Sequence, residues 1–338
     1  MSASIILGIE SSCDDTSAAI ISGSKILSNI AANQAIHNEY GGVVPELASR
    51  AHQQNIIPVV EKAFSKANIQ QNDICAIGFT RGPGLLGSLL VGTSFAKSLA
   101  MSLDVPLIEV NHLQAHILAH FIDDANPKPP TFPFLCLTVS GGHTMIVLVK
   151  DYFEMEIIGK TIDDAAGEAF DKIGKIFDLD YPAGPIIDKL AKEGNPDAFQ
   201  FNKPRMENYD YSFSGIKTSV LYFIQKEVRK NPDFIKENLN DLCASVQRSI
   251  IEILMNKLEK ASVDLHIKDV AIAGGVSANS ALRKAMELNQ EKLGWNIFIP
   301  KFEYTTDNAA MIAIVAKLKY ERGEFTDIRT TATAKYDL

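Results

Sequence analysis

Two histidines four positions apart are the residues of this sequence best suited to chemistry. His112 and His116 would lie on one face of a helix, about 6 Å apart along its axis. That geometry lets both imidazoles reach a single ion such as Zn²⁺ or Fe²⁺. Leu113 stands where zinc proteases of the H-E-x-x-H type carry their glutamate base. The pair therefore predicts a metal that binds or polarises a substrate, without the general base of a protease.

A chance pairing is the alternative, because the chain has seven histidines. His120 continues the row, but it would lie about 12 Å along the axis from His112, too far for one ion to bind both. We interpret His120 as a surface or packing histidine. A third metal ligand must then come from elsewhere in the chain.

The composition predicts a soluble, cytoplasmic protein. The chain has 338 residues, enough for two domains or two lobes, and is 46% hydrophobic and 22% charged. Its cysteines are scattered and form no C-x-x-C pair, which is typical of reduced thiols. No signal peptide and no apolar stretch of membrane-spanning length is visible.

The charge balance argues against a broad nucleic-acid-binding face. There are 33 basic and 41 acidic side chains, a net charge of −8, whereas nucleic-acid binding usually needs a basic surface. A local patch is still compatible with the sequence, since Lys203, Arg205 and Lys217 fall in one segment and Arg283 and Lys284 in another. A partner protein could also supply the charge.

Two parts of the chain follow a similar order of elements. The first part is expected to begin with a hairpin around a polar turn, strands 4–10 and 17–22, followed by a long helix at 45–67. A strand at 74–80, a glycine turn at 82–87 and a helix to about 103 come next. Strand 107–110 then leads into the histidine helix. The second repeats a hairpin, 134–139 with 144–149, and a strand, 270–273, followed by glycines 274 and 275 and a helix from about 277. Residues 123–133 hold four prolines and are interpreted as a linker.

This repetition predicts an α/β protein of two duplicated lobes with a nucleotide cleft between them. We expect the first lobe at 1–122, completed by a C-terminal helix at about 305–338, and the second at 134–304. Backbone amides in glycine turns can approach phosphates closely. The alternative is that these glycines only permit tight turns. The 82–87 turn is not a Walker A loop, because Ser88 stands where its lysine should be.

Several further blocks resemble the universal tRNA threonylcarbamoyladenosine transferase family, once described as O-sialoglycoprotein endopeptidases. They run in order over nearly the whole chain: Glu10 to Thr16, Tyr40-Gly-Gly-Val-Val-Pro-Glu-Leu-Ala-Ser-Arg-Ala-His52, Gly82-Pro-Gly84, His112 to His116, Ser140-Gly-Gly-His-Thr144, Asp163 to Lys172, Ser212-Phe-Ser-Gly215, Gly274 to Asn279 and Thr306-Asp-Asn308. The resemblance implies the actin-like, Hsp70-like and sugar-kinase-like ATPase fold. It also implies transfer of a threonylcarbamoyl group from threonylcarbamoyl-AMP to N6 of adenosine 37 in tRNAs that read codons beginning with A.

The resemblance also assigns the third metal ligand and a set of partners. Asp307 matches the aspartate that completes the family's site for one divalent ion, Fe²⁺ or Zn²⁺; taken alone, it would be an acid at the start of a helix over about 308–322. Two imidazoles and one carboxylate leave coordination positions open, as in catalytic sites. The implied partners are tRNA, a catalytically inactive paralogue and a small ATPase.

The implied substrate contacts lie mostly in the second lobe. For the adenylate, or ATP, they are Thr138, Val139, Ser140, Gly141, Gly142, Asp171, Gly184, Asp188 and Asn279. The alternative for Asp171 is a solvated charge on an amphipathic helix, and for Asn279 a hydrogen bond at a helix N-terminus. Asp14 and Asp15, in the first hairpin turn, match acids that orient water or metal near phosphates; otherwise they are turn formers.

Three positions depart from the family pattern without removing a proposed ligand. Asp15 stands where many members have glutamate, Ala183 replaces a glycine, and Asn111 stands where some relatives have another histidine.

Two other functions compete with the transferase. One is a nucleotide-gated scaffold ATPase of the actin-like superfamily, which has no use for an open metal site. The other is the protease, which lacks a base beside the histidines. Fold alone cannot choose among them.

Overall fold

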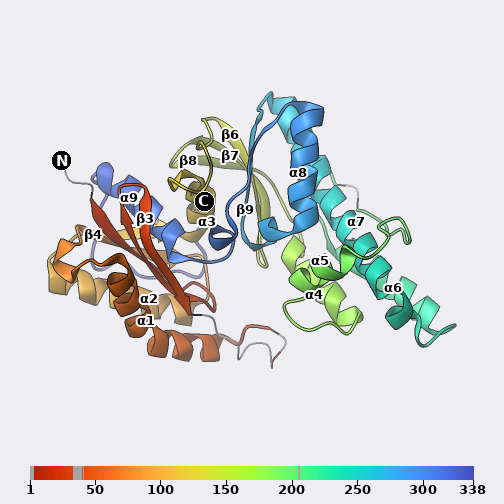
Figure 1. The fold of residues 1–338 in the computed structure, drawn as a ribbon, viewed down its shortest axis with the longest axis horizontal. Helices are drawn as coiled ribbons and strands as arrows, with labels where there is room; N and C mark the ends of the chain where they lie inside the picture. The colour runs from red at the N-terminus through yellow and green to blue at the C-terminus, as the bar shows by residue number, and fades with distance from the viewer. Residues whose placement is uncertain (1–3, 33–39, 41, 205) are drawn as a thin grey trace. The chain divides into compact units, whose positions relative to one another are not determined.

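The computed structural model describes residues 4–32, 40, 42–204 and 206–338 (Figure 1). The chain forms two compact units, Met1–Pro129 with Pro300–Leu338, and Pro130–Ile299. Residues 123–129 and 300–304 thus belong to the first unit, not to a linker and the second lobe. Asp124 shows why, because its carboxylate accepts hydrogen bonds from Tyr304 (2.8 Å) and from Lys301 (2.5 Å).

Within the described residues each unit contains a five-stranded sheet, and the two sheets have the same strand order. The orders are β3-β2-β1-β4-β5 and β8-β7-β6-β9-β10. In each, two antiparallel pairs are followed by two parallel pairs. The strands are β1 (Ile5–Glu10), β2 (Thr16–Ser22), β3 (Lys25–Ala32), β4 (Ala76–Gly82), β5 (Leu107–Asn111), β6 (Phe134–Val139), β7 (Thr144–Asp151), β8 (Glu154–Lys160), β9 (Asp269–Ala273) and β10 (Asn296–Phe298). The predicted duplicated α/β architecture is confirmed.

Helices cover both faces of the first sheet (Figure 1). Leu7 and Ile9 of β1 pack with residues of α1 (Pro45–Ala67) and α2 (Leu86–Leu103) in one apolar cluster. Successive strand residues point to opposite faces, and Gly8 accordingly lies against α9 (Ala309–Glu321). The short α3 (His112–Leu118) follows β5 directly.

Small residues bring α9 unusually close to this sheet. A Cβ on Gly8 would lie 2.6 Å from the Ala309 carbonyl oxygen, and one on Gly78 would lie 2.4 Å from the Ala316 Cβ. Both glycines therefore admit the helix backbone where any side chain would collide. This close packing holds the first turn of α9 in position against the sheet, and therefore also the residues just before the helix.

The second unit buries its core between its sheet and a group of helices. Its apolar cluster joins β6, β7 and β9 with residues of α4 (Ala166–Ile176), α5 (Ala183–Ala191), α6 (Ser214–Val228), α7 (Phe234–Leu265) and α8 (Ser280–Leu293). Short 3₁₀ turns complete the described chain: η2 (Gln71–Asp73), η3 (Ala119–Phe121), η4 (Gly275–Ala278) and η5 (Phe302–Tyr304).

Among the described helices, α2 is long and apolar enough by composition to cross a membrane. Core helices of soluble proteins pass the same test. Here Leu89 and Ala96 are fully buried, and Ala96 belongs to the apolar cluster of the first unit. One face of α2 thus packs in the core of the first unit, while only 33% of the helix is buried and Leu90 and Met101 are exposed.

Candidate functional site

The helix that carries both histidines is fixed at its first turn by Asn111. The Asn111 Oδ1 accepts hydrogen bonds from the backbone N–H groups of Leu113 (2.9 Å) and Gln114 (3.3 Å), as an N-cap does. Its Nδ2 donates to the carbonyl oxygens of Tyr336 (3.4 Å) and Asp337 (2.8 Å). The chain beyond α9 thus holds the cap of α3 in place. The predicted histidine helix is confirmed, since α3 spans His112–Leu118.

Asp307 completes a cluster with the two histidines. Its Oδ1 lies 3.4 Å from the His112 Nε2 and 3.2 Å from the His116 Nε2. One ligand atom from each of the three residues lies within 4.8 Å of the others. Among the described residues, these three side chains form a group that could hold a metal ion. Asp307 is in place because Asn308 caps α9 by accepting from the Met311 N–H (3.1 Å), while α9 packs closely on β1. Both imidazoles are buried.

The charges of this cluster support metal binding. Burial opposes ionisation of Asp307, but His112 and His116 outweigh it and hold the Asp307 pKa far below its ordinary value. Burial likewise opposes a charge on His112, yet Asp307 and Glu10 raise the His112 pKa well above its ordinary value. The carboxylates of Asp307 and Glu10 therefore favour a positive charge at the position of the two histidines. Two imidazole nitrogens and a carboxylate oxygen form a donor set that suits Zn²⁺ or Fe²⁺.

His120 is not part of this cluster. It is 1% exposed, and its Nδ1 pairs with the Asn126 side-chain amide at 2.9 Å. Of the two interpretations from the sequence, it is a packing histidine.

The first hairpin turn brings further acids toward the metal cluster. Asp14 and Asp15 follow β1 and are partly buried. Burial raises the Asp15 pKa to about 7, and the negative charges of Asp14, Asp307 and Glu10 add to the shift. Asp15 is thus in the electrostatic field of the cluster and is not an ordinary exposed turn former.

The substrate residues expected at 138–142 end β6 and form the turn after it. The Ser140 carbonyl oxygen accepts from the Gly167 N–H (3.2 Å), which brings the start of α4 to this turn. A Cβ on Gly141 or Gly142 would meet nothing within 4 Å, so the backbone there is open to a ligand. Thr138 differs, because it is fully buried within β6 between Met145 of β7 and Ala273 of β9. Its role in substrate binding stays a prediction, as does that of Val139.

The structure brings the remaining expected contacts of the second unit together. The Asp171 Oδ1 accepts from the Ala183 N–H (2.8 Å), and Gly184 N–H also bonds to this carboxylate, whose pKa is raised by burial. Asp171 therefore holds the start of α5 and is not a solvated charge. Asp188, on α5, accepts from the N–H and the hydroxyl of Ser280 (3.1 and 2.7 Å).

Asn279 has the hydrogen bonds of a helix cap. Its Oδ1 accepts from the N–H groups of Ala281 (3.0 Å) and Leu282 (3.1 Å) at the start of α8, and its Nδ2 donates to the Gln247 Oε1 (2.7 Å). The helix-cap interpretation from the sequence is correct for this geometry. Its contact with a nucleotide stays a prediction.

The glycine turns of the two units differ in what surrounds them. A Cβ on Gly82 would lie 2.1 Å from the Thr333 carbonyl oxygen, and one on Gly84 would lie 2.4 Å from that of Ser12. A Cβ on Gly275, in the second unit, would meet nothing within 4 Å. The first turn is thus filled by the chain itself, which favours a packing role for its glycines. In the turn of the second unit only Gly275 is open, because a Cβ on Gly274 would lie 2.5 Å from the Val139 carbonyl oxygen.

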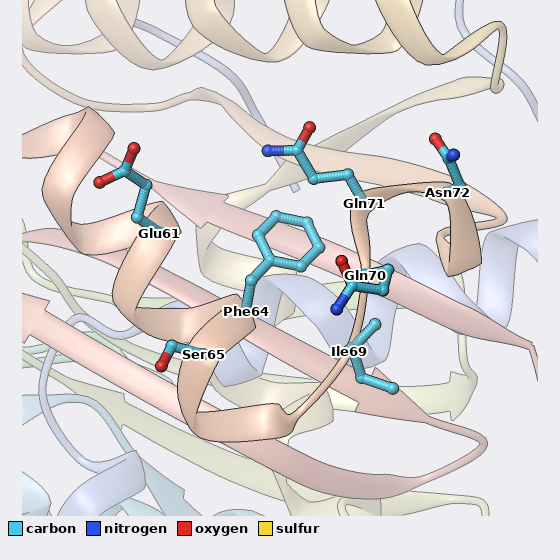
Figure 2. A pocket seen from close by; sticks show the side chains of 7 residues that line it. All are labelled: Glu61, Phe64, Ser65, Ile69, Gln70, Gln71 and Asn72. Atoms are coloured by element: carbon cyan, nitrogen blue, oxygen red, sulfur yellow. The ribbon is translucent and has the colours of Figure 1, made fainter.

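A surface hollow lies elsewhere, at the C-terminal end of α1. Figure 2 shows Phe64 at its base and polar side chains around it, among them Glu61, Gln70 and Gln71. None of its lining residues belongs to the sites described above. We assign it no function.

Two of the basic residues singled out in the sequence are engaged within the second unit. Lys203 pairs with Glu252, and the Arg283 Nε donates to the Ser277 carbonyl oxygen (2.8 Å). Arg205 lies outside the described residues.

Comparison with known proteins decides the family. Residues 25–314 match the family model described as tRNA N6-adenosine threonylcarbamoyltransferase. The chain belongs to this family. It is similar over its full length to the transferase of Riemerella anatipestifer, with 83% identity over 100% of this chain and 99% of the relative. The relative from Christiangramia forsetii is 62% identical over 98% and 97% of the two chains.

The family makes this chain an acyltransferase that acts on tRNA, and the resemblance seen in the sequence is confirmed. The cluster of His112, His116 and Asp307 has the composition of a possible metal site in this transferase.

Two solved structures show the fold. Full-length HypF in a phosphate- and nucleotide-bound form matches with a TM-score of 0.60 at 13% identity, over 96% of this chain and 47% of HypF. The chain thus spans about half of that longer protein. The ROK hexokinase from Thermus thermophilus matches with a TM-score of 0.53 at 14% identity, over 94% and 100% of the two chains. The predicted actin-like, Hsp70-like and sugar-kinase-like fold is confirmed.

Sequence reasoning missed Glu10 and the capping role of Asn111. Glu10 appeared only within a family motif, although it ends an otherwise apolar strand and is fully buried. An acid at the end of such a strand needs buried partners, and this signal could have drawn attention to it.

Proposed function

We propose that this chain transfers the threonylcarbamoyl group of threonylcarbamoyl-AMP to N6 of adenosine 37 in tRNAs that read codons beginning with A, and releases AMP. The observation that carries the proposal is the meeting of His112, His116 and Asp307 around one point in a member of a tRNA threonylcarbamoyltransferase family. Such a cluster has no use in a scaffold that only binds a nucleotide.

The first unit would hold one Fe²⁺ or Zn²⁺ ion through His112, His116 and Asp307. When bound, such an ion supplies a Lewis acid for the carbonyl of the threonylcarbamoyl group. The protein contributes the fixed geometry: the N-cap at Asn111 sets α3, and the close packing of α9 on β1 sets Asp307. Asp14 and Asp15 would orient water or the ion beside the phosphate.

The second unit would bind the adenylate, or ATP. The turn Ser140-Gly141-Gly142 has open backbone, and amide donors suit a phosphate. Asp171, Gly184, Asp188 and Asn279 would contact the nucleoside, with Asp171 accepting from the ribose hydroxyls. Thr138 and Val139 would contribute backbone only. The expected cleft between the lobes stays a prediction.

The reaction itself demands positioning more than acid or base help. A bond forms between N6 of adenosine and the carbamoyl carbon, the bond from that carbon to the phosphate oxygen breaks, and N6 releases one proton. AMP is a good leaving group, so orientation of the two reactants and stabilisation of the developing negative charge carry most of the catalysis.

Partners and compartment are also part of the proposal. We expect the chain to work with a catalytically inactive paralogue and a small ATPase, in the cytoplasm. Because the net charge is −8, such partners would supply basic surface for tRNA. This is testable by comparing tRNA affinity of the chain alone and of the reconstituted assembly.

The deciding experiment is transfer in a reconstituted mixture of threonylcarbamoyl-AMP, unmodified tRNA and the partner proteins. Wild type should form the modified adenosine and His112→Ala should not. His120→Ala is the matched control, since it removes a buried histidine from the same row without touching the cluster; its melting temperature reports any loss of stability. Full transfer by His112→Ala would make the pair structural. No transfer by wild type, with ATP turnover present, would favour the nucleotide-gated scaffold.

A further inference from the structure

Glu10 is a buried carboxylate whose surroundings are arranged around one of the proposed metal ligands. It is the last residue of β1 and is 0% exposed. Its Oε2 lies 3.1 Å from the His112 Nδ1 and accepts from the Thr80 hydroxyl at 2.6 Å. Its Oε1 accepts from the backbone N–H of Ser12. Both oxygens are thus engaged by donors.

The two nitrogens of His112 face different groups. Nδ1 faces Glu10, whereas Nε2 faces Asp307 at 3.4 Å. A neutral imidazole carries its proton on one nitrogen and a lone pair on the other. Because Glu10 and Asp307 are both carboxylates, both nitrogens of the metal-free ring face acceptors. A bound ion would take the place of the proton on Nε2, and Glu10, which can only accept, would keep the remaining proton on Nδ1.

The orientation of both histidine rings depends on the contact between Glu10 and the His112 Nδ1. The His116 Nδ1 is buried and has no hydrogen-bond partner among the described residues. The ring centroids of His112 and His116 lie 4.7 Å apart at an interplanar angle of 89°, so a rotation of one ring would bring it against the other. Holding His112 therefore also restricts His116.

We propose that Glu10 is the positioning residue of the metal centre, which fixes the tautomer and the ring orientation of His112 so that Nε2 is presented to the ion. The inference rests on the metal site of the proposed function and assigns a role to a residue outside its ligand set. Partners of this kind typically change metal affinity about 10- to 100-fold.

Substitution by glutamine cannot reproduce the contacts of the carboxylate. If the amide nitrogen takes the Oε1 position, it meets the Ser12 N–H, and a neutral oxygen replaces the charge beside His112. If it takes the Oε2 position, its N–H group meets the His112 Nδ1 and favours the opposite tautomer. Glu10→Leu keeps an apolar side chain in the buried position but removes every acceptor.

The test is the affinity for Zn²⁺ alone, measured by competition with a chromophoric chelator, without tRNA or adenylate. We expect Glu10→Gln to bind about tenfold more weakly than wild type and Glu10→Leu about 100-fold more weakly. Ser12→Ala is the matched control, because the Ser12 Oγ is the other group near the His112 Nδ1, at 3.2 Å. It should bind within about threefold of wild type.

A second measurement guards against variants that fail to fold. Nitrogen-15 spectra of Zn²⁺-loaded wild type should show the His112 Nδ1 protonated and Nε2 bound to the metal. A protonated Nε2, unchanged affinity of folded Glu10→Gln, or a large loss in Ser12→Ala alone would overturn the role of Glu10 and leave the metal site intact. Failure of wild type to bind Zn²⁺ or Fe²⁺ would overturn both the site and the role of Glu10.

Discussion

The carboxyl ends of β1 and β6 occupy equivalent places in two sheets of the same order, yet they carry different chemistry. After β1 come a buried carboxylate and a turn with Asp14 and Asp15. After β6 come Ser140, Gly141 and Gly142, and a Cβ added to either glycine would meet nothing within 4 Å. The first end offers fixed charges near two imidazoles, whereas the second offers backbone.

The difference shows how a duplicated fold separates two tasks. Charged side chains at the end of the first sheet are held by buried hydrogen bonds, which suits the binding of a cation. Exposed amides at the end of the second suit an anion, because small residues let a phosphate come close. The two sheets have the same strand order, and in the proposed function the residues at the strand ends would set what each unit binds.

Among the variants considered, removal of the Asp307 side chain should have the largest effect on the cation-binding end of the first unit. Asp307→Ala takes away a proposed metal ligand and the acceptor that lies near both His112 and His116. We expect loss of bound Zn²⁺ or Fe²⁺ and a fall in transfer of about 1000-fold or more, since a Lewis acid contributes several kcal/mol. The metal content after gel filtration measures the bound ion, and the reconstituted assay measures the rate of transfer. Asp327→Ala, which removes an exposed acid paired with Arg329, is the control; transfer retained by Asp307→Ala would remove the metal from the mechanism.

Alanine at Gly84 should destabilise the first unit, because the added Cβ would lie 2.4 Å from the Ser12 carbonyl oxygen. Overpacking of this kind costs about 1–3 kcal/mol. Gly141→Ala, at the open turn, should change the free energy of unfolding by less than about 0.5 kcal/mol. Urea denaturation of both variants measures the two changes in the free energy of unfolding. Equal stability of the two would contradict the idea that the first glycine turn is filled by the chain.

Alanine at Gly142 should affect binding and not stability. A Cβ there meets nothing within 4 Å in the protein, but it would obstruct a phosphate at the turn. We expect the affinity for AMP to fall about tenfold, or about 1.4 kcal/mol, in isothermal titration calorimetry with an unchanged melting temperature. If the affinity is unaltered, the turn does not bind the phosphate.

A smaller effect should appear in the pH dependence of stability. The Asp15 pKa is raised by burial to about 7, from an ordinary value of 3.8. The folded protein thus retains a proton that the unfolded chain releases, and this contribution to stability is lost as the pH rises from about 4 through 7. Asp15→Asn, compared with wild type in chelator, should therefore gain more in melting temperature at pH 8 than at pH 5. A gain that does not depend on pH would contradict the raised pKa.

Much of the fold followed from local patterns in the sequence. The long helix expected at 45–67 begins at Pro45, as a proline in the first turn indicates. The hairpins and the strands before the glycine turns were also found. The strands β3, β8 and β10 were missed; β3 and β8 are at sheet edges and partly exposed, and β10 has only three residues.

The site was harder to derive, because its residues meet through packing over long sequence distances. The His112–His116 pair is visible as a local repeat, but Asp307 lies 191 residues beyond His116 and was assigned only by the family resemblance. Glu10 reaches His112 across 102 residues. No periodicity within one element encodes such contacts. They depend on the parallel pairing of β1 with β4 and on the glycines that admit α9.

The first unit is built from both ends of the chain, while the second is one continuous stretch, Pro130–Ile299. During synthesis, the ribosome therefore releases the whole second unit before α9 and Asp307 emerge. Until then, the face of the first sheet that α9 covers stays uncovered, and His112 and His116 lack Asp307, the carboxylate that lies near both. Domains generally fold as units during translation, so the proposed metal centre would be assembled last, and a chain that stops before residue 307 would lack one of its three proposed ligands.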